Sequence, residues 1–170
     1  MHRAGAINPP IGLSRGCAGA FQLYNNWLYY RTISVESSQE GLQGWSDRIA
    51  LSIDAYLLGA EVDDQAFCYA LLQFVISECV QAPCCPGGDL ITMAYTETNG
   101  PCSLRTLLVG LYLNARLERN TFDHVWRHVP AEFKSDLGAA FFTRDLHEVR
   151  IGTVESLSTR YLPPPPQNDG

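Results

Sequence analysis

A short segment near the start of the chain has the residue pattern of a hydrolase nucleophile. Residues Gly12-Leu13-Ser14-Arg15-Gly16 fit G-x-S-x-G, which in hydrolases places the serine on a sharp turn between a strand and a helix, beside an oxyanion hole. A helix is predicted after this segment, but only eleven residues precede it, and these include Pro9 and Pro10. No strand is predicted there, so we interpret Ser14 as a loop serine. A small serine hydrolase is kept as an alternative function.

Thiols and imidazoles are the other groups that could do chemistry. Cys79, Cys84 and Cys85 cluster where a helix is predicted to stop, and His124 and His128 lie one helical turn apart. The chain has no C-x-x-C pair, and its Cys-to-His spacings fit no zinc-finger pattern. We therefore predict no metal and no cofactor, with a metal-dependent helical regulator as a further alternative. The vicinal pair Cys84-Cys85 has no neighbouring cation that would lower a thiol pKa.

Composition narrows the classes of partner. The 170 residues carry 12 basic and 18 acidic side chains, a net charge of -6, and 11 of the 12 cations are arginines. A basic field that could hold a phosphate backbone is missing, and no apolar run is long enough to span a bilayer, so neither nucleic acid nor membrane is predicted as a partner.

Glu97, Glu132 and Asp136 are interpreted as solvated acids on helix faces. The sequence therefore predicts a protein that is not an enzyme.

Hydrophobic periodicity predicts an almost wholly helical chain. The first predicted helix, 18–30, is apolar on two sides, with Phe21, Tyr24 and Leu28 on one stripe and Leu23 and Trp27 on the next. Thr32, Ile33 and Val35 permit one short strand, and residues 36–44 have the composition of an exposed loop. Further helices are predicted from an N-cap at Ser46 to about residue 60, from a cap at Asp63 to about Val80, over 89–97, from Ser103 to about Ala115, over 119–128, and from Pro130 to about Phe141. The helix beginning at Asp63 is apolar on both faces and is expected at the centre.

Three segments follow from this pattern. Residues 1–17 are an irregular lead, 18–150 a helical domain, and 151–170 a proline-rich tail that is expected to be extended or disordered, since it contains Pro163 to Pro166. Proline and asparagine near the start interrupt any secretory signal, and two of the six cysteines, Cys68 and Cys79, fall inside helical apolar patterns. We expect reduced thiols and a cytoplasmic or nuclear location.

The order of these elements resembles the second half of a BTB/POZ domain, in particular its fungal branch. The resemblance rests on Trp27-Leu28-Tyr29 running into a short extended segment, then on Ala55-Tyr56-Leu57-Leu58-Gly59, and then on Asp64 to Phe67 at the start of a longer helix. Downstream, Ala94 to Thr98, Ser103-Leu104-Arg105 and Pro130 to Phe133 are similar to the helical extension of the fungal proteins. About residues 20–146 are covered. The strands and helical hairpin with which the family begins are missing before Phe21.

The resemblance implies a fold and a function. The expected fold is mainly α, a bundle of about six to seven helices with at most one short strand or hairpin, that is, a truncated form of the α+β BTB/POZ domain. The implied function is non-enzymatic protein-protein interaction, with a substrate adaptor for a cullin-type ubiquitin ligase as the specific form. The candidate contact residues are Phe21, Tyr24, Trp27, Leu28, Tyr56 and Phe67. Apolar helix faces left without the missing sheet are expected to drive self-association.

Overall fold

The described part of the chain is a stack of helices. The computed structural model describes residues 18–82, 84–114, 125–143, 157–159 and 162. Its helices are α1 (Ala18–Tyr30), α2 (Gly41–Glu61), α3 (Gln65–Gln81), α4 (Gly88–Glu97), α5 (Ser103–Asn114) and α7 (Ala131–Thr143). The prediction of a mainly α bundle is confirmed. Within these described ranges no strand forms, and residues 31–37 instead cross from α1 toward α2 without regular structure.

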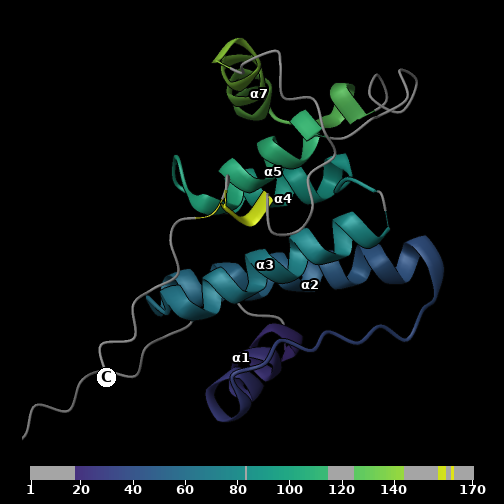
Figure 1. Ribbon diagram of the computed structural model, residues 1–170, viewed down its shortest axis with the longest axis vertical. Helices are drawn as coiled ribbons and strands as arrows, with labels where there is room; N and C mark the ends of the chain where they lie inside the picture. The colour runs from purple at the N-terminus through teal and green to yellow at the C-terminus, as the bar shows by residue number, and fades with distance from the viewer. Residues whose placement is uncertain (1–17, 83, 115–124, 144–156, 160–161, 163–170) are drawn as a thin grey trace, which may run out of the picture.

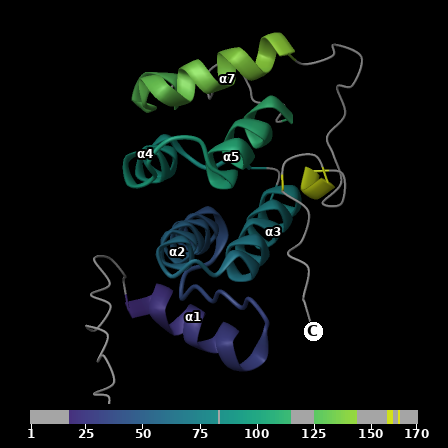
Figure 2. The ribbon, with the colours of Figure 1, turned by 90° about the vertical axis from the view of Figure 1, so that its left-hand side faces the viewer.

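The helices lie in layers (Figures 1 and 2). The α1 helix covers one side of the α2–α3 pair, α4 and α5 pack on the other side of that pair, and α7 closes the far end. An ion pair joins α2 to α3, with Arg48 Nη2 lying 2.7 Å from Glu78 Oε2. The indole of Trp45 donates a hydrogen bond of 3.3 Å to the Glu78 carbonyl oxygen. In this order of layers, α1 and α7 lie at opposite ends of the stack.

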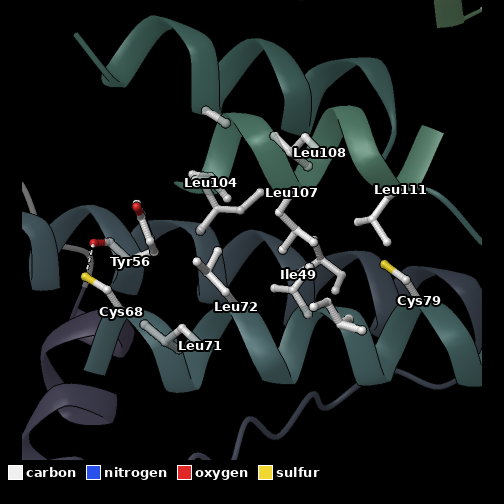
Figure 3. Close-up of a cluster of buried hydrophobic side chains, with 14 of the residues drawn as sticks. Ile49, Tyr56, Cys68, Leu71, Leu72, Cys79, Leu104, Leu107, Leu108 and Leu111 are labelled. Carbon is white, nitrogen blue, oxygen red and sulfur yellow. Dashed lines mark hydrogen bonds between the residues drawn. The ribbon is translucent and has the colours of Figure 1, made fainter. Parts of the chain in front are cut away.

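The core runs through α3 and α5. Figure 3 shows Leu104, Leu107 and Leu111 of α5 directed toward α2 and α3. Leu71 and Leu72 of α3 are both at most 2% exposed although they occupy neighbouring helical positions. A helix that buries adjacent residues has neighbours on two sides, as the doubly apolar pattern of this segment predicts. The central position expected for α3 agrees with its contacts to both α2 and α5.

The start of α2 differs from the prediction. The helix begins at Gly41, five residues before the predicted N-cap Ser46, which is half-buried inside it. Gly41 has φ +69°, a conformation that favours glycine, and a Cβ atom on Gly44 would overlap the backbone carbonyl of Gln39. These two glycines let the chain turn tightly into the helix. The same glycines gave this stretch the composition of a loop.

The α2–α3 junction is a tight corner. The cap of α3 is Asp64, one residue after the predicted Asp63, and its Oδ1 accepts from the Phe67 amide at 2.9 Å. Asp63 lies in the left-handed region at φ +57°, which Asp tolerates better than most residues. A Cβ atom on Gly59 would come within 2.8 Å of Phe67 Cδ1, so glycine is required for this approach of α2 to α3.

Three predictions near the end of the chain are tested in part. Of the helix predicted over 119–128, residues 125–128 are helical, and the others lie outside the described residues. Phe141, near which the helix from Pro130 was predicted to end, lies inside α7 and is 57% exposed. Leu157 to Thr159 form a helical turn where an extended or disordered tail was predicted, and Leu157 and Leu162 are buried; the rest of the predicted tail lies outside the described residues. None of the helices in the described ranges has the length and apolar character to cross a membrane.

Candidate protein-interaction surface

The inner face of α1 is built on one aromatic side chain of α3. Ala20, Leu23 and Trp27 repeat at three- and four-residue spacing and are all buried. The Trp27 ring centroid lies 5.8 Å from that of Phe67, and the Tyr24 centroid lies 5.0 Å from it. These are ordinary distances for favourable aromatic pairs. Phe67 of α3 is therefore one anchor of α1, whose backbone otherwise lies mainly against α2.

The residues that carry the family resemblance converge on the same ring. Trp27 of α1, Gly59 of α2 and the α3 cap Asp64 all contact Phe67 or its backbone amide. Burial and the Asp64 carboxylate raise the pKa of Tyr24, which lies beside this cluster. The residues on which the resemblance rests therefore serve packing, because they hold α1, α2 and α3 together.

Three of the six predicted contact residues are buried in this packing and were therefore predicted wrongly as surface residues. Trp27, Tyr56 and Phe67 are 8%, 7% and 0% exposed, so they belong to the core and cannot form a contact surface in this conformation. Tyr24 is half-buried. Phe21 and Leu28, at 54% and 48%, are exposed as the prediction requires.

The side of α1 turned away from the bundle forms a distinct surface. We define the outer face of α1 as Phe21, Asn25, Leu28 and Tyr29, which are all exposed and lie on one side of the helix at spacings of three, four and seven. Tyr29 is 76% exposed, and it was not among the predicted contact residues. The segment 18–30 contains no acidic or basic residue. The outer face of α1 is therefore uncharged, and three of its four residues are aromatic or aliphatic, with the polar Asn25 between them.

A second exposed aromatic site lies at the other end of the stack. Phe141 and Phe142 at the end of α7 are 57% and 88% exposed, and their ring centroids are 6.3 Å apart. Adjacent residues on a helix point about 100° apart, so a helix packed on one side rarely buries both members of such a pair. That doublet was the signal in the sequence from which this site could have been inferred.

The cysteine cluster is buried at Cys79 and half-buried at Cys84 and Cys85. Cys79 is buried, and burial raises its pKa above the ordinary thiol value. Burial likewise raises the pKa of Cys85 to about 12, and its thiol donates to the Leu111 carbonyl oxygen at 3.7 Å. Such thiols stay protonated near neutral pH and are poor nucleophiles. In the part of the chain that the structure describes, no group of three His, Cys, Asp or Glu side chains could hold a metal ion.

The remaining chemical candidates do not assemble into a site among the described residues. Ser14 and His124 lie outside them, while His128 is exposed at the end of the 125–128 segment. Asp136 accepts a 2.8 Å hydrogen bond from the Tyr95 hydroxyl, which links α7 to α4. Glu132 is exposed, whereas Glu97 is half-buried and so is not the fully solvated acid that was predicted.

Comparisons with known proteins supply no relative. A scan of protein-family models finds no match, and searches of curated proteins and of solved structures find no significant match either.

Proposed function

We propose that this chain is a non-enzymatic protein-protein interaction module of BTB/POZ type that binds through the outer face of α1. The observation that supports this proposal is the exposure of Phe21, Leu28 and Tyr29 on one side of a helix whose opposite side is fixed in the core. Contiguous exposed apolar residues mark interaction sites, and aromatic side chains are enriched there. Because the inner face of α1 is packed in the core, the outer face is already presented on a folded helix before a partner binds.

The first partner that we propose for this face is a second copy of the chain. In a two-fold contact the same face is present twice, so a net charge on that face is repelled by the same net charge on the partner. The protein has a net charge of -6, but α1 contributes none of it. Pairing through α1 therefore avoids the repulsion that a charged face would bring. Anchors on one helix at spacings of four and seven residues suit a helix-against-helix contact.

Two further parts of the proposal concern a heterologous partner and the cellular location. The first rests on the family resemblance and the second on the free cysteines. A cullin-type ligase scaffold is the proposed heterologous partner, because adaptor duty is what the BTB/POZ resemblance implies. The proposed location is the cytoplasm or the nucleus. It is supported by Cys68, Cys79, Cys84, Cys85 and Cys102, which are all free thiols.

Sedimentation equilibrium of the purified chain tests the proposal. We expect a concentration-dependent dimer that the double variant Phe21→Glu/Leu28→Glu converts to a monomer, because two carboxylates would be buried in the contact. Phe142→Glu is the matched control: it also introduces a carboxylate at an exposed aromatic position, but at the opposite end of the stack. A dimer that survives in the double variant and dissociates in the control would contradict the assignment of the surface to α1.

A further inference from the structure

The segment between α1 and α2 displays a serine close to an arginine. Ser34 lies three residues after Arg31, and of the 12 basic residues in the sequence only Arg31 has a serine at that spacing. Both side chains are exposed. Figure 1 shows the segment as the plain tube that joins the end of α1 to α2. Arginine three residues before a serine is the pattern that arginine-directed protein kinases select, because carboxylates in their substrate clefts bind the guanidinium.

Side-chain exposure alternates along this segment. Thr32, Ser34 and Glu36 are exposed. Between them, Ile33 is half-buried and Val35 is buried. Such alternation is typical of an extended backbone, in which neighbouring side chains point to opposite sides. Ser34 therefore faces solvent while the residues on either side of it face the bundle. Because a protein kinase takes its substrate as an extended segment, no helix has to unwind to present this serine.

Only side-chain packing holds the segment against the bundle. Val35 belongs to the hydrophobic core cluster, and Ile33 packs against that cluster. Among the described residues, no backbone hydrogen bond joins residues 32–36 to another part of the chain. A kinase cleft encloses residues on both sides of the acceptor, so this segment has to lift from the bundle when it binds. Lifting exposes Ile33 and Val35 but breaks no backbone hydrogen bond, and the helices stay folded.

Arg31 is open to the carboxylates of a partner. Its guanidinium carbon lies 5.3 Å from the centroid of the Trp27 ring. Within the part of the chain that the structure describes, this guanidinium forms no ion pair. The N–H donors of a guanidinium lie in its plane, so a group stacked on an aromatic ring still presents them at its edge. A kinase can therefore bind Arg31 without first breaking a salt bridge.

We propose that Ser34 is a phosphorylation site for an arginine-directed Ser/Thr protein kinase. In the transfer, the Ser34 Oγ atom attacks the γ-phosphorus of ATP, and its proton passes to a carboxylate of the kinase. The bond between the γ-phosphorus and the β,γ-bridging oxygen breaks, and ADP leaves. The phosphoserine adds a charge of about −2 near neutral pH. This modification does not depend on a partner at the outer face of α1.

Two other serines in the same segment provide a control and a rival. Ser38 is also exposed, but the residue three positions before it is the uncharged Val35. Ser37 is half-buried, and its Oγ atom accepts a 3.1 Å hydrogen bond from the Gln39 amide. Glu40 lies three residues after Ser37, and this is the pattern that acid-directed kinases select. Ser38 is therefore the matched control for Ser34, and Ser37 is the rival site.

Incubation of the full chain with radiolabelled ATP and calmodulin-dependent protein kinase, which selects arginine three residues before its acceptor, tests the proposal. We expect about one phosphate per chain, which peptide mapping by mass spectrometry assigns to Ser34. Ser34→Ala is expected to lower the incorporation by more than about ten-fold, and Ser38→Ala to leave it unchanged within about two-fold. Arg31→Gln is expected to lower kcat/KM by about ten-fold or more, because a neutral amide cannot replace the guanidinium at the kinase carboxylates.

Several results would overturn the proposal. They are the absence of label on the folded parent chain, label on Ser37 or Ser38 instead of Ser34, and activity of an acid-directed kinase alone. Equal kcat/KM values for the parent and Arg31→Gln, with matching far-UV circular dichroism, would remove the role of the arginine. If Arg31→Gln does not fold, Ser34→Ala and Ser38→Ala still decide the site, because both positions are exposed.

Discussion

The guanidinium carbon of Arg105 lies 4.3 Å from the centroid of the Tyr95 ring, and Nη2 of the same arginine donates to the Tyr95 carbonyl oxygen at 2.8 Å. The Nη2 atom also donates to the Thr98 carbonyl at 2.6 Å, and Nε donates to the Thr98 hydroxyl at 2.7 Å. Carbonyls at the end of a helix have no partner within the helix. Arg105 of α5 thus supplies donors to the last turn of α4 and holds the two helices together.

Arg105→Lys is expected to lower the free energy of unfolding by about 1–3 kcal/mol. A single ammonium group can neither bond several oxygens in the fixed geometry of a guanidinium nor stack flat on a ring. Urea unfolding followed by circular dichroism measures the change. Arg127→Lys, at an exposed position, is the control and is expected to change the free energy by less than about 0.5 kcal/mol. Equal effects of the two substitutions would contradict this role of Arg105.

Gly59→Ala is expected to destabilise the fold by about 1–3 kcal/mol, because the new methyl group would come within 2.8 Å of Phe67 Cδ1 and 3.0 Å of Cys68 Sγ. Both neighbours are buried and have little room to move. Gly138→Ala is the matched control in α7, where an added Cβ meets nothing within 4 Å. Helix propensity predicts that this control gains about 0.5–1 kcal/mol. Thermal unfolding of both variants should give shifts of opposite sign, and a stabilised Gly59→Ala variant would show that α2 and α3 pack differently.

Burial raises the pKa of the Cys68 thiol from 9.0 to about 12, with smaller contributions from the Asp64 and Asp63 carboxylates. A raised folded-state pKa means that the unfolded chain loses this proton first. The stability that Cys68 contributes is therefore complete below pH 9 and is lost as the pH rises from 9 toward 12. The thiol also donates to the Tyr56 carbonyl oxygen at 3.6 Å (Figure 3), a bond that a serine hydroxyl can replace.

Cys68→Ser is accordingly expected to flatten the decline in stability above pH 9. The parent chain should lose up to about 1.4 kcal/mol more per pH unit than the variant between pH 9 and 12. Urea unfolding at a series of alkaline pH values measures both slopes. Other buried groups, such as Tyr112, titrate in both proteins and cancel in the difference. Parallel slopes would mean that Cys68 is not buried as described.

The sequence predicted the helices better than it predicted the surface. Both ends of α1 were predicted correctly, because its apolar stripes stop at the β-branched segment that follows Arg31. The start of α2 was missed because Gly44 is required only by its close approach to the Gln39 backbone, and Gly41 only by its positive φ, and composition reveals neither. These errors arise where a neighbouring segment, not the local pattern, decides the conformation.

The same reasoning explains the errors at the candidate surface. Two stripes of α1 are apolar, and periodicity does not say which one faces the bundle. The stripe with Leu23 and Trp27 is buried because it meets Phe67, and the stripe with Phe21 and Leu28 is left outside. Predicting contact residues from apolar character alone therefore mixed core residues with exposed ones.

Photocrosslinking through position 25 tests the central claim most directly, that the outer face of α1 is a protein-binding surface which pairs with itself. Asn25 lies in the middle of this face and is exposed, so p-benzoylphenylalanine in its place points at any partner seated there. The same amino acid at the exposed position Ser135 of α7 is the control. We predict that irradiation of the purified protein links two chains through position 25, with the crosslinked peptide mapping to residues 18–30 of the second copy, and gives no dimer through position 135. Crosslinked dimers through position 135 alone, or a peptide from position 25 that maps away from residues 18–30, would contradict the account.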